Sequence, residues 1–169
     1  SPTFTVFGLP LTMLAVQWLC VLFTALDKGN RNRNQKIQEI VLWIIPILSN
    51  LSILGIYALA LGREFSPVAW TMIPMGLLFA VIGNYMPKCT QNTTIGIKVI
   101  WTLNNEENWN ATHRFGGKVW FFGGIVTMLT AFFGSFWLLM VILAAMVILP
   151  TIYSYLYYRN HEKEQKDGN

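Results

Sequence analysis

One polar stretch contains most of the side chains that could bind a ligand or take part in chemistry. It runs from Gly83 to Gly117, reads GNYMPKCTQNTTIGIKVIWTLNNEENWNATHRFGG, and separates two strongly apolar parts of the chain. Its amide, hydroxyl, indole, imidazole and cationic groups are suited to hydrogen bonding, stacking and anion binding. We regard eleven of its residues as candidate binding residues: Asn84, Lys88, Asn92, Gly96, Lys98, Trp101, Thr102, Trp109, Thr112, His113 and Arg114.

His113 is the residue best suited to acid–base chemistry or metal binding. Trp109 precedes it by four residues, so on a helix the two rings would stack, and Thr112 and Gly116 would share their face. No second ligand lies at metal-binding spacing on that helix, and no nucleophile–base pair is evident. We therefore expect a structural histidine, no catalytic residue, no metal and no cofactor. His161, in the charged tail, is expected to be solvated.

The composition indicates that this stretch is positioned by membrane helices. The chain has 169 residues, of which 54% are hydrophobic and 12% charged, whereas soluble domains have about 25% charged residues. About 20 apolar residues suffice to cross a bilayer. Four runs without a charged residue reach or exceed that length: 4–26, 40–61, 65–86 and 119–158.

The last of these runs must turn. As one helix its 40 residues would extend about 60 Å, twice the thickness of a hydrocarbon core. Gly134 and Ser135 are the natural place for the turn, which predicts helices near 118–134 and 136–158. The expected fold is all-α: a polytopic transmembrane helix bundle of about five spans, with a cytoplasmic interfacial loop between spans three and four.

Three local signals predict how the polar stretch itself folds. Pro87 disfavours helix in the residue before it, so a helix should end near Tyr85. Alternation over 93–102 predicts an extended segment that lies along the interface or folds back on the helices. Asn104 or Asn105 is suited to cap the following helix, whose first turn contains two glutamates.

The distribution of basic residues predicts the orientation. Lysine and arginine accumulate in cytoplasmic loops. Eleven of the twelve fall in the loops 27–39 and 87–118 or in the C-terminal tail, and Arg63 alone lies on the opposite side. We therefore expect a multi-pass cell-membrane protein with the N-terminus outside and the polar stretch and tail in the cytoplasm.

The spans contain polar and proline residues but no ionisable side chain other than cysteine and tyrosine. Pro46 and Pro74 interrupt helix hydrogen bonding. Asn50 is expected to hydrogen-bond to a neighbouring helix, with a ligand pocket at the bend as the alternative. The absence of Asp, Glu, Lys, Arg and His from the spans argues against a proton-coupled transporter. Glycines at 116–117 and 123–124 predict close helix packing.

The motifs of the polar stretch resemble the SdpI family of bacterial membrane proteins. The matching residues, in order, are Gly83-Asn84, Pro87-Lys88, Asn92, Gly96-Ile97-Lys98, Trp101-Thr102-Leu103, Trp109 and Thr112-His113-Arg114 with Gly116. The resemblance implies an immunity protein that protects a bacterium from its own secreted killing peptide. It also implies signalling, in which the protein holds a transcriptional repressor at the membrane when toxin is engaged.

The resemblance also implies a domain organisation. Members are expected to have six spans, and this chain, which begins at Ser1 without a methionine, would correspond to the last five. Residues 1–27 would be the remainder of an N-terminal family domain whose Pro-x-His loop is absent. Residues 28–159 would form the four-span domain and 160–169 the charged tail. Lys88 and Lys98 occupy positions where arginine is common in the family, so the bidentate hydrogen bonding of a guanidinium is lost there.

Three functions remain open. The first is a membrane immunity protein that resists a secreted killing peptide and signals through a repressor. The second is a small-solute or lipid transporter or channel, because helices broken at Pro46 and Pro74 often line binding sites. The third is a membrane enzyme that uses His113. The expected partners are membrane lipids, a toxin peptide and a cytoplasmic repressor protein, without direct contact to nucleic acid.

Overall fold

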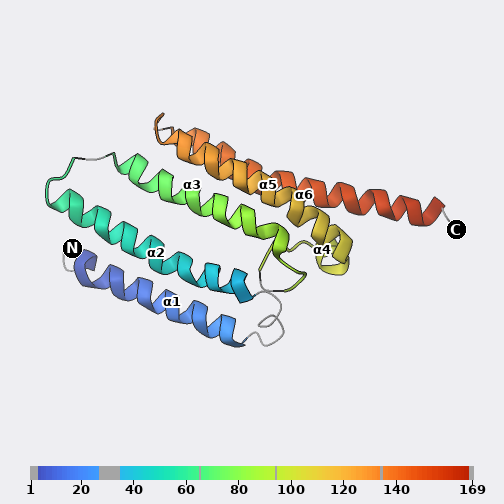
Figure 1. Ribbon diagram of the computed structural model, residues 1–169, viewed down its shortest axis with the longest axis horizontal. Coiled ribbons are helices and arrows are strands. Elements are labelled where there is room, and N and C mark those ends of the chain that lie inside the picture. Colours follow the sequence, from blue (N-terminus) through green and yellow to red (C-terminus); the bar gives the residue numbers. More distant parts are fainter. Residues whose placement is uncertain (1–3, 27–34, 65, 94, 134, 168–169) are drawn as a thin grey trace. The chain divides into compact units, whose positions relative to one another are not determined.

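The computed structural model describes residues 4–26, 35–64, 66–93, 95–133 and 135–167 (Figure 1). These residues are almost entirely helical and contain no strand, so the predicted all-α fold is confirmed. The elements are a π-helical turn Phe4–Gly8, α1 (Leu9–Leu26), α2 (Gln35–Ala60), α3 (Pro67–Tyr85), the 3-10 turn η2 (Met86–Lys88), α4 (Ile100–Asn104), α5 (Glu106–Thr130) and α6 (Phe136–Asp167).

The long helices fit the predicted membrane protein. Three described segments are long and apolar enough to cross a bilayer: Gln38–Ala60, Val68–Lys88 and Trp137–His161. The predicted first span contributes a shorter apolar helix, Pro10–Phe23. The predicted fourth span lies in α5, whose first turns are polar. Most of the predicted basic loop at 27–39 and the turn residue Gly134 lie outside the described residues.

The chain divides into two compact units, Ser1–Trp70 and Thr71–Asn169. In the first, Gln17 connects α1 with α2, because its Nε2 donates to the Leu42 carbonyl at 2.9 Å. Pro46 has no N–H, so this carbonyl lacks its partner within the helix. Asn50, by contrast, donates to the carbonyl of Pro46 at 2.8 Å, in its own helix. The interhelical bond predicted for Asn50 is therefore wrong, since a carbonyl four residues earlier is within its reach.

In the second unit, α3 and α5 pack through facing glycines. A Cβ at Gly76 would lie 2.5 Å from the Gly124 carbonyl oxygen, and one at Gly83 would lie 2.7 Å from that of Gly117. The two glycines on each helix are two turns apart, and their order shows that the helices are antiparallel. The predicted close packing at Gly117 and Gly124 is confirmed, and its partners are on α3.

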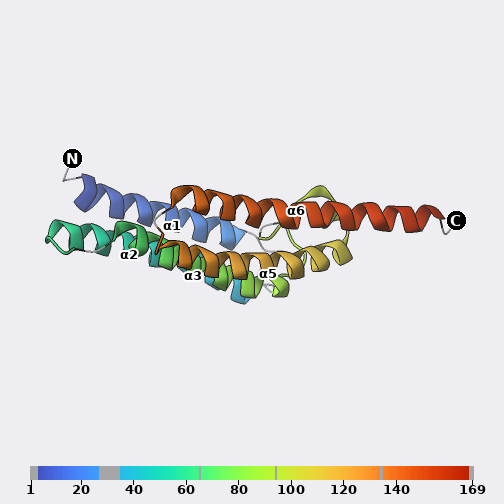
Figure 2. The same cartoon turned by 90° about the horizontal axis from the view of Figure 1, so that it is seen from above.

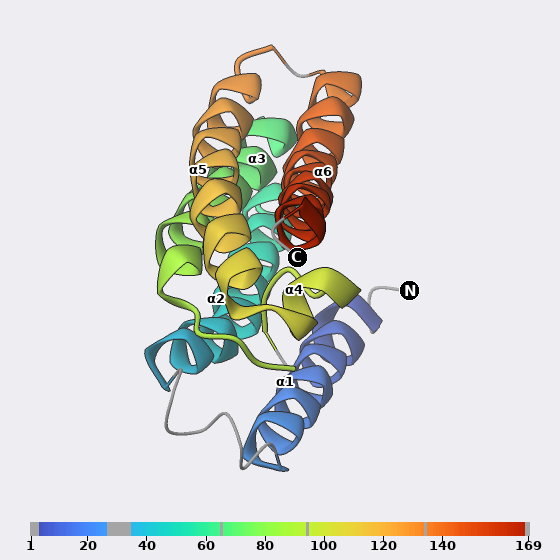
Figure 3. The same cartoon turned by 90° about the vertical axis from the view of Figure 1, so that its right-hand side faces the viewer.

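α5 and α6 lie side by side in the same unit, with α4 beside them (Figure 3). Trp120 Nε1 donates to the Met146 carbonyl at 2.9 Å. Pro150 lies four residues after Met146 and removes the N–H that would otherwise occupy this carbonyl. A side chain of the neighbouring helix thus satisfies the polar group that proline exposes, as lipid requires. The C-terminal part of α6 continues past the start of α5 (Figure 2).

Candidate functional site

The polar stretch comprises the end of α3, the connection through η2 and α4, and the start of α5. α3 ends at Tyr85 and Asn105 caps α5, with its Oδ1 accepting from the Asn108 N–H at 2.9 Å, so both predicted helix boundaries are confirmed. The extended segment predicted over 93–102 is wrong at its end, because α4 begins at Ile100. The Thr102 hydroxyl accepts from the Val99 N–H at 3.0 Å and donates to the Ile97 carbonyl at 2.8 Å, which stabilises a helical turn.

Trp109 and His113 form the centre of the site. Their rings stack as predicted, with centroids 4.0 Å apart and planes 19° from parallel. Neither side chain is exposed. Trp109 Nε1 donates to the Cys89 carbonyl at 2.8 Å, which ties α5 to the residue that follows η2. The pair therefore anchors the preceding loop to the start of α5.

The contacts of His113 define its protonation. The Ile97 N–H donates to Nε2 at 3.0 Å, so Nε2 must have a free lone pair. Nδ1 then carries the proton and donates to the Trp109 carbonyl at 2.8 Å. Burial lowers the pKa of His113, against an opposite effect of the Trp109 carbonyl, and so favours the neutral ring that the acceptor role of Nε2 requires. Both nitrogens are occupied by the backbone, which supports the structural interpretation over the enzymatic one.

Gly96 allows the loop to lie against these two rings. Its φ of 126° is a conformation that L side chains rarely adopt. A Cβ there would lie 2.5 Å from Nε2 of His113 and 2.8 Å from the Trp109 ring. The position therefore requires glycine both for its backbone and for its space.

Asn92 and Cys89 hold the loop closed. Asn92 Oδ1 accepts from the Ile95 N–H at 2.7 Å, and its Nδ2 donates to the Thr90 carbonyl at 2.8 Å. Cys89 is 4% exposed. Burial raises the pKa of its thiol, while the hydrogen bond from Asn92 acts in the opposite direction. Cys89 is thus a packed thiol rather than a thiolate.

A buried amide, which the sequence reasoning missed, connects α5 with α6. Asn108 Nδ2 donates to the Ser154 carbonyl at 3.0 Å, and its Oδ1 accepts from the hydroxyls of Thr112 and Ser154, both at 2.8 Å. The spacing of four residues between Asn108 and Thr112 could have predicted their contact on one helix face. The contact with Ser154 could not be predicted in this way, because Ser154 is 46 residues from Asn108. We call the fully buried set Thr102, Asn108, Trp109, Thr112, His113 and Ser154 the polar core.

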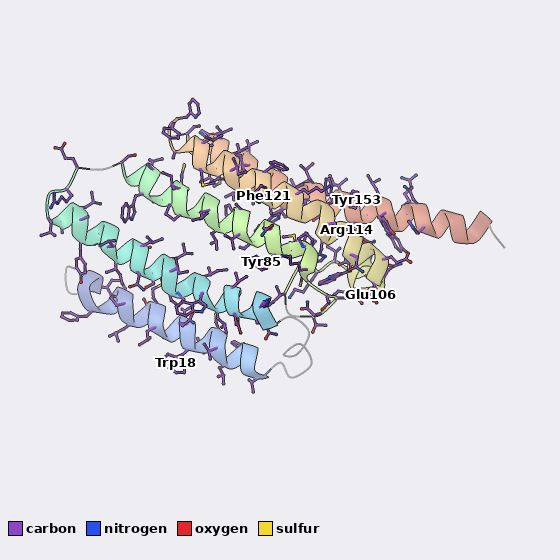
Figure 4. The ribbon with its side chains drawn as sticks, viewed as in Figure 1. Trp18, Tyr85, Glu106, Arg114, Phe121 and Tyr153 are labelled. Atoms are coloured by element: carbon purple, nitrogen blue, oxygen red, sulfur yellow. The ribbon has the colours of Figure 1, made fainter. Side chains whose placement is uncertain are left out.

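The other candidate residues lie outside this polar core. Asn84, Lys88, Lys98 and Arg114 are exposed. The Lys88 ammonium lies 4.7 Å from the centre of the Tyr85 ring, and Lys98 donates to the Thr93 carbonyl at 3.2 Å. Figure 4 labels Tyr85 at the end of α3 and Arg114 on α5. We call these four exposed residues the polar rim.

Aromatic rings of α6 extend the site. Trp101 meets Tyr155 edge-on at 5.5 Å and stacks on Tyr158 at 6.2 Å. His161 stacks on Tyr157 at 4.1 Å and is half-buried, so the expectation that it is solvated is wrong. A helix continuing through the tail, which charge alone did not predict, brings it one turn from Tyr157.

These observations define a polytopic helical membrane protein with a polar core at one end of three packed helices. Residues 88–154, which contain that core, match the SdpI/YfhL protein family. The predicted resemblance to the SdpI family is thereby confirmed for this part of the chain. The immunity protein SdpI of Bacillus subtilis (strain 168) is 27% identical in an alignment of 162 residues that covers 94% of this chain and 77% of that protein. No solved structure matches the chain.

Proposed function

We propose that this chain is a membrane immunity protein that makes its cell resistant to a secreted, membrane-active peptide. The observation that carries the proposal is the similarity to an immunity protein over 94% of the chain. A similarity of that length includes the spans as well as the polar stretch. The function therefore belongs to the whole helical protein rather than to one motif.

The geometry supports a binding role rather than catalysis. The polar core is closed, and the nitrogens of His113 bond to the backbone. The cations of the polar rim and the partly exposed Trp101 are the groups that can meet another molecule, and cationic and aromatic side chains are favoured at interfaces. In our proposal the polar core holds the rim in shape, and the rim contacts the partner.

The finer parts of the proposal concern orientation and signalling. The excess of lysine and arginine on one side supports a cytoplasmic position for the rim. The toxin would then meet the spans or the opposite face. A cytoplasmic repressor protein held at the rim would connect toxin binding to gene expression. Exposed Lys88 and Lys98 offer the positive charge for an acidic surface on that repressor.

Protection from killing tests the proposal. The full-length protein is expressed in a sensitive bacterium and challenged with the secreted peptides of its source. Trp109→Ala, which opens the core, is compared with Trp18→Ala, which removes a tryptophan that is 67% exposed on α1. Membrane abundance is measured for each protein by quantitative immunoblotting. We expect wild type and Trp18→Ala to protect and Trp109→Ala to fail.

The role of the rim is tested in the same cells. Lys88→Gln combined with Lys98→Gln removes two exposed charges without touching the polar core. Loss of the repressor from the membrane fraction, with protection retained, supports separate toxin and repressor surfaces. Wild-type protein that is abundant in the membrane yet gives no protection against any of the peptides contradicts the immunity function.

One observation favours the second candidate, a carrier of small apolar molecules. A pocket of about 440 Å³ in the first unit is lined by Trp43, Pro46, Ile47, Asn50, Leu51 and Leu54, where the sequence predicted a bend. Binding or flux in proteoliposomes that is lost in Asn50→Leu would support a carrier. Equal binding by wild type and Asn50→Leu would remove this pocket from consideration.

A further inference from the structure

A second pocket lies over the exposed side of α5 and is distinct from the polar core. It has a volume of about 440 Å³ and is lined by Pro87 at η2, by Glu107, Asn110 and Arg114 on α5, and by Tyr157 on α6 (Figure 4 labels Arg114). All five residues belong to the unit Thr71–Asn169. Three elements therefore converge on one polar depression.

Three polar side chains of this pocket, those of Glu107, Asn110 and Arg114, are available to a ligand. Within the described ranges, no hydrogen bond or ion pair forms to the side chains of Glu107, Asn110 or Arg114, and all three residues are exposed. Glu107 precedes Arg114 by seven residues, so the two charges lie on one helix face about two turns, or roughly 10 Å, apart along the axis. That separation leaves both free to contact opposite ends of one ligand.

The pocket lies where apolar helix gives way to polar residues. Pro87 is the second-last residue of the apolar segment Val68–Lys88, and Tyr157 lies four residues before the end of Trp137–His161. Tyrosine is enriched at this depth because its ring suits lipid and its hydroxyl suits water. Arg114 is closer than Glu107 to the part of α5 that continues into apolar residues. The pocket therefore opens at the level of lipid headgroups.

We propose that this pocket binds the headgroup of a phospholipid that carries both a phosphate and an amine. The Arg114 guanidinium donates two parallel hydrogen bonds to the phosphate, with the Asn110 amide as a further donor. The Glu107 carboxylate, farther from the apolar part, accepts from the ammonium. A headgroup with phosphate alone places no cation beside Glu107 and is bound less well. The proposal does not depend on the immunity function.

Native mass spectrometry of the purified full chain tests this assignment. The probes are phosphatidylethanolamine, phosphatidylglycerol and phosphatidylcholine with identical acyl chains. We expect retained phosphatidylethanolamine to exceed phosphatidylglycerol in wild type. Arg114→Gln should weaken both about tenfold, the effect of losing a charge-assisted hydrogen bond. Glu107→Gln should abolish the preference for phosphatidylethanolamine while phosphatidylglycerol remains bound.

Controls separate this site from general lipid adhesion. Arg63→Gln removes an exposed arginine in the other unit and should change nothing. Thermal unfolding of each variant should match wild type, because the altered side chains are exposed. Wild-type lipid retention in Arg114→Gln overturns the proposal. Displacement of the lipid by soluble glycerophosphoethanolamine at an equal concentration would overturn the lipid assignment in favour of a soluble phosphate ester.

Discussion

Replacing Gly96 with alanine tests whether the loop must lie against the Trp109–His113 pair. At φ 126° the new side chain is strained, at a cost of about 1–3 kcal/mol. Its Cβ would also lie 2.5 Å from Nε2 of His113, so the loop must lift. Lifting breaks the bond from the Ile97 N–H to Nε2, which costs about another 1 kcal/mol or more. We expect local opening to become easier by at least about 2 kcal/mol.

Labelling of Cys89 measures this opening directly. The thiol is 4% exposed, and its carbonyl accepts from Trp109, so a water-soluble maleimide reaches it only when the loop lifts. Cys20→Ser removes the other cysteine of the chain. A loss of about 2 kcal/mol predicts labelling about 30-fold faster than in wild type. The rate is measured at one pH, because the thiolate is the reactive form.

A second glycine provides the matched control. Gly62 also has a positive φ, of 71°, but nothing lies within 4 Å of a Cβ added there. Gly62→Ala introduces backbone strain without a clash and in the other unit, so it should leave the labelling rate of Cys89 unchanged. A rate for Gly96→Ala within twofold of wild type would show that the loop does not depend on the contact with His113. That result would refute the requirement for glycine at position 96.

Three further predictions concern the polar core and the helix pair behind it. Burial in the folded state lowers the pKa of His113 below its ordinary 6.5. The contribution of this residue to the free energy of unfolding is therefore fully present above pH 6.5 and is lost as the pH drops from there towards the folded pKa. The melting temperature of His113→Gln should lose this pH dependence. Asn108→Ala leaves buried groups of Thr112 and Ser154 unpaired and should cost about 3 kcal/mol or more in unfolding by SDS titration, whereas exposed Asn84→Ala should cost little. Trp120→Phe should cost about 1 kcal/mol, and less in Pro150→Ala, where the helix regains its own donor; equal costs in both backgrounds would contradict the pairing.

Helix ends were predictable from the sequence because their causes act locally. Pro87 ends α3 at Tyr85, and Asn105 caps α5 through a residue three positions away. The Trp109–His113 stack likewise follows from a spacing of four on one helix. Each of these interactions lies within a single turn of backbone, where residue type and spacing determine the geometry.

Other features required contacts between distant residues. Ser154 is 46 residues from Asn108, and Ile97 is 16 from His113. No local pattern specifies such a pair, because many other polar residues could meet Asn108 equally well. The error at Thr102 has a different origin: alternation suggested an extended chain, but a side-chain bond to the Val99 N–H, three residues away, favoured a helical turn. Local hydrogen bonding outweighed a weak periodic signal.

A motif can be rich in polar residues for two different reasons, and the polar core and the polar rim are an example of each. Trp109, Thr112 and His113 are fully buried, and their polar atoms bond to protein groups, so another molecule cannot reach them without unfolding the site. They form a support in the protein interior, where unpaired polar groups are costly. In our proposal, recognition is performed by exposed neighbours such as Lys88 and Arg114. A variant of the core that abolishes protection therefore shows that the support is needed, whereas only a variant of an exposed residue can show what is bound.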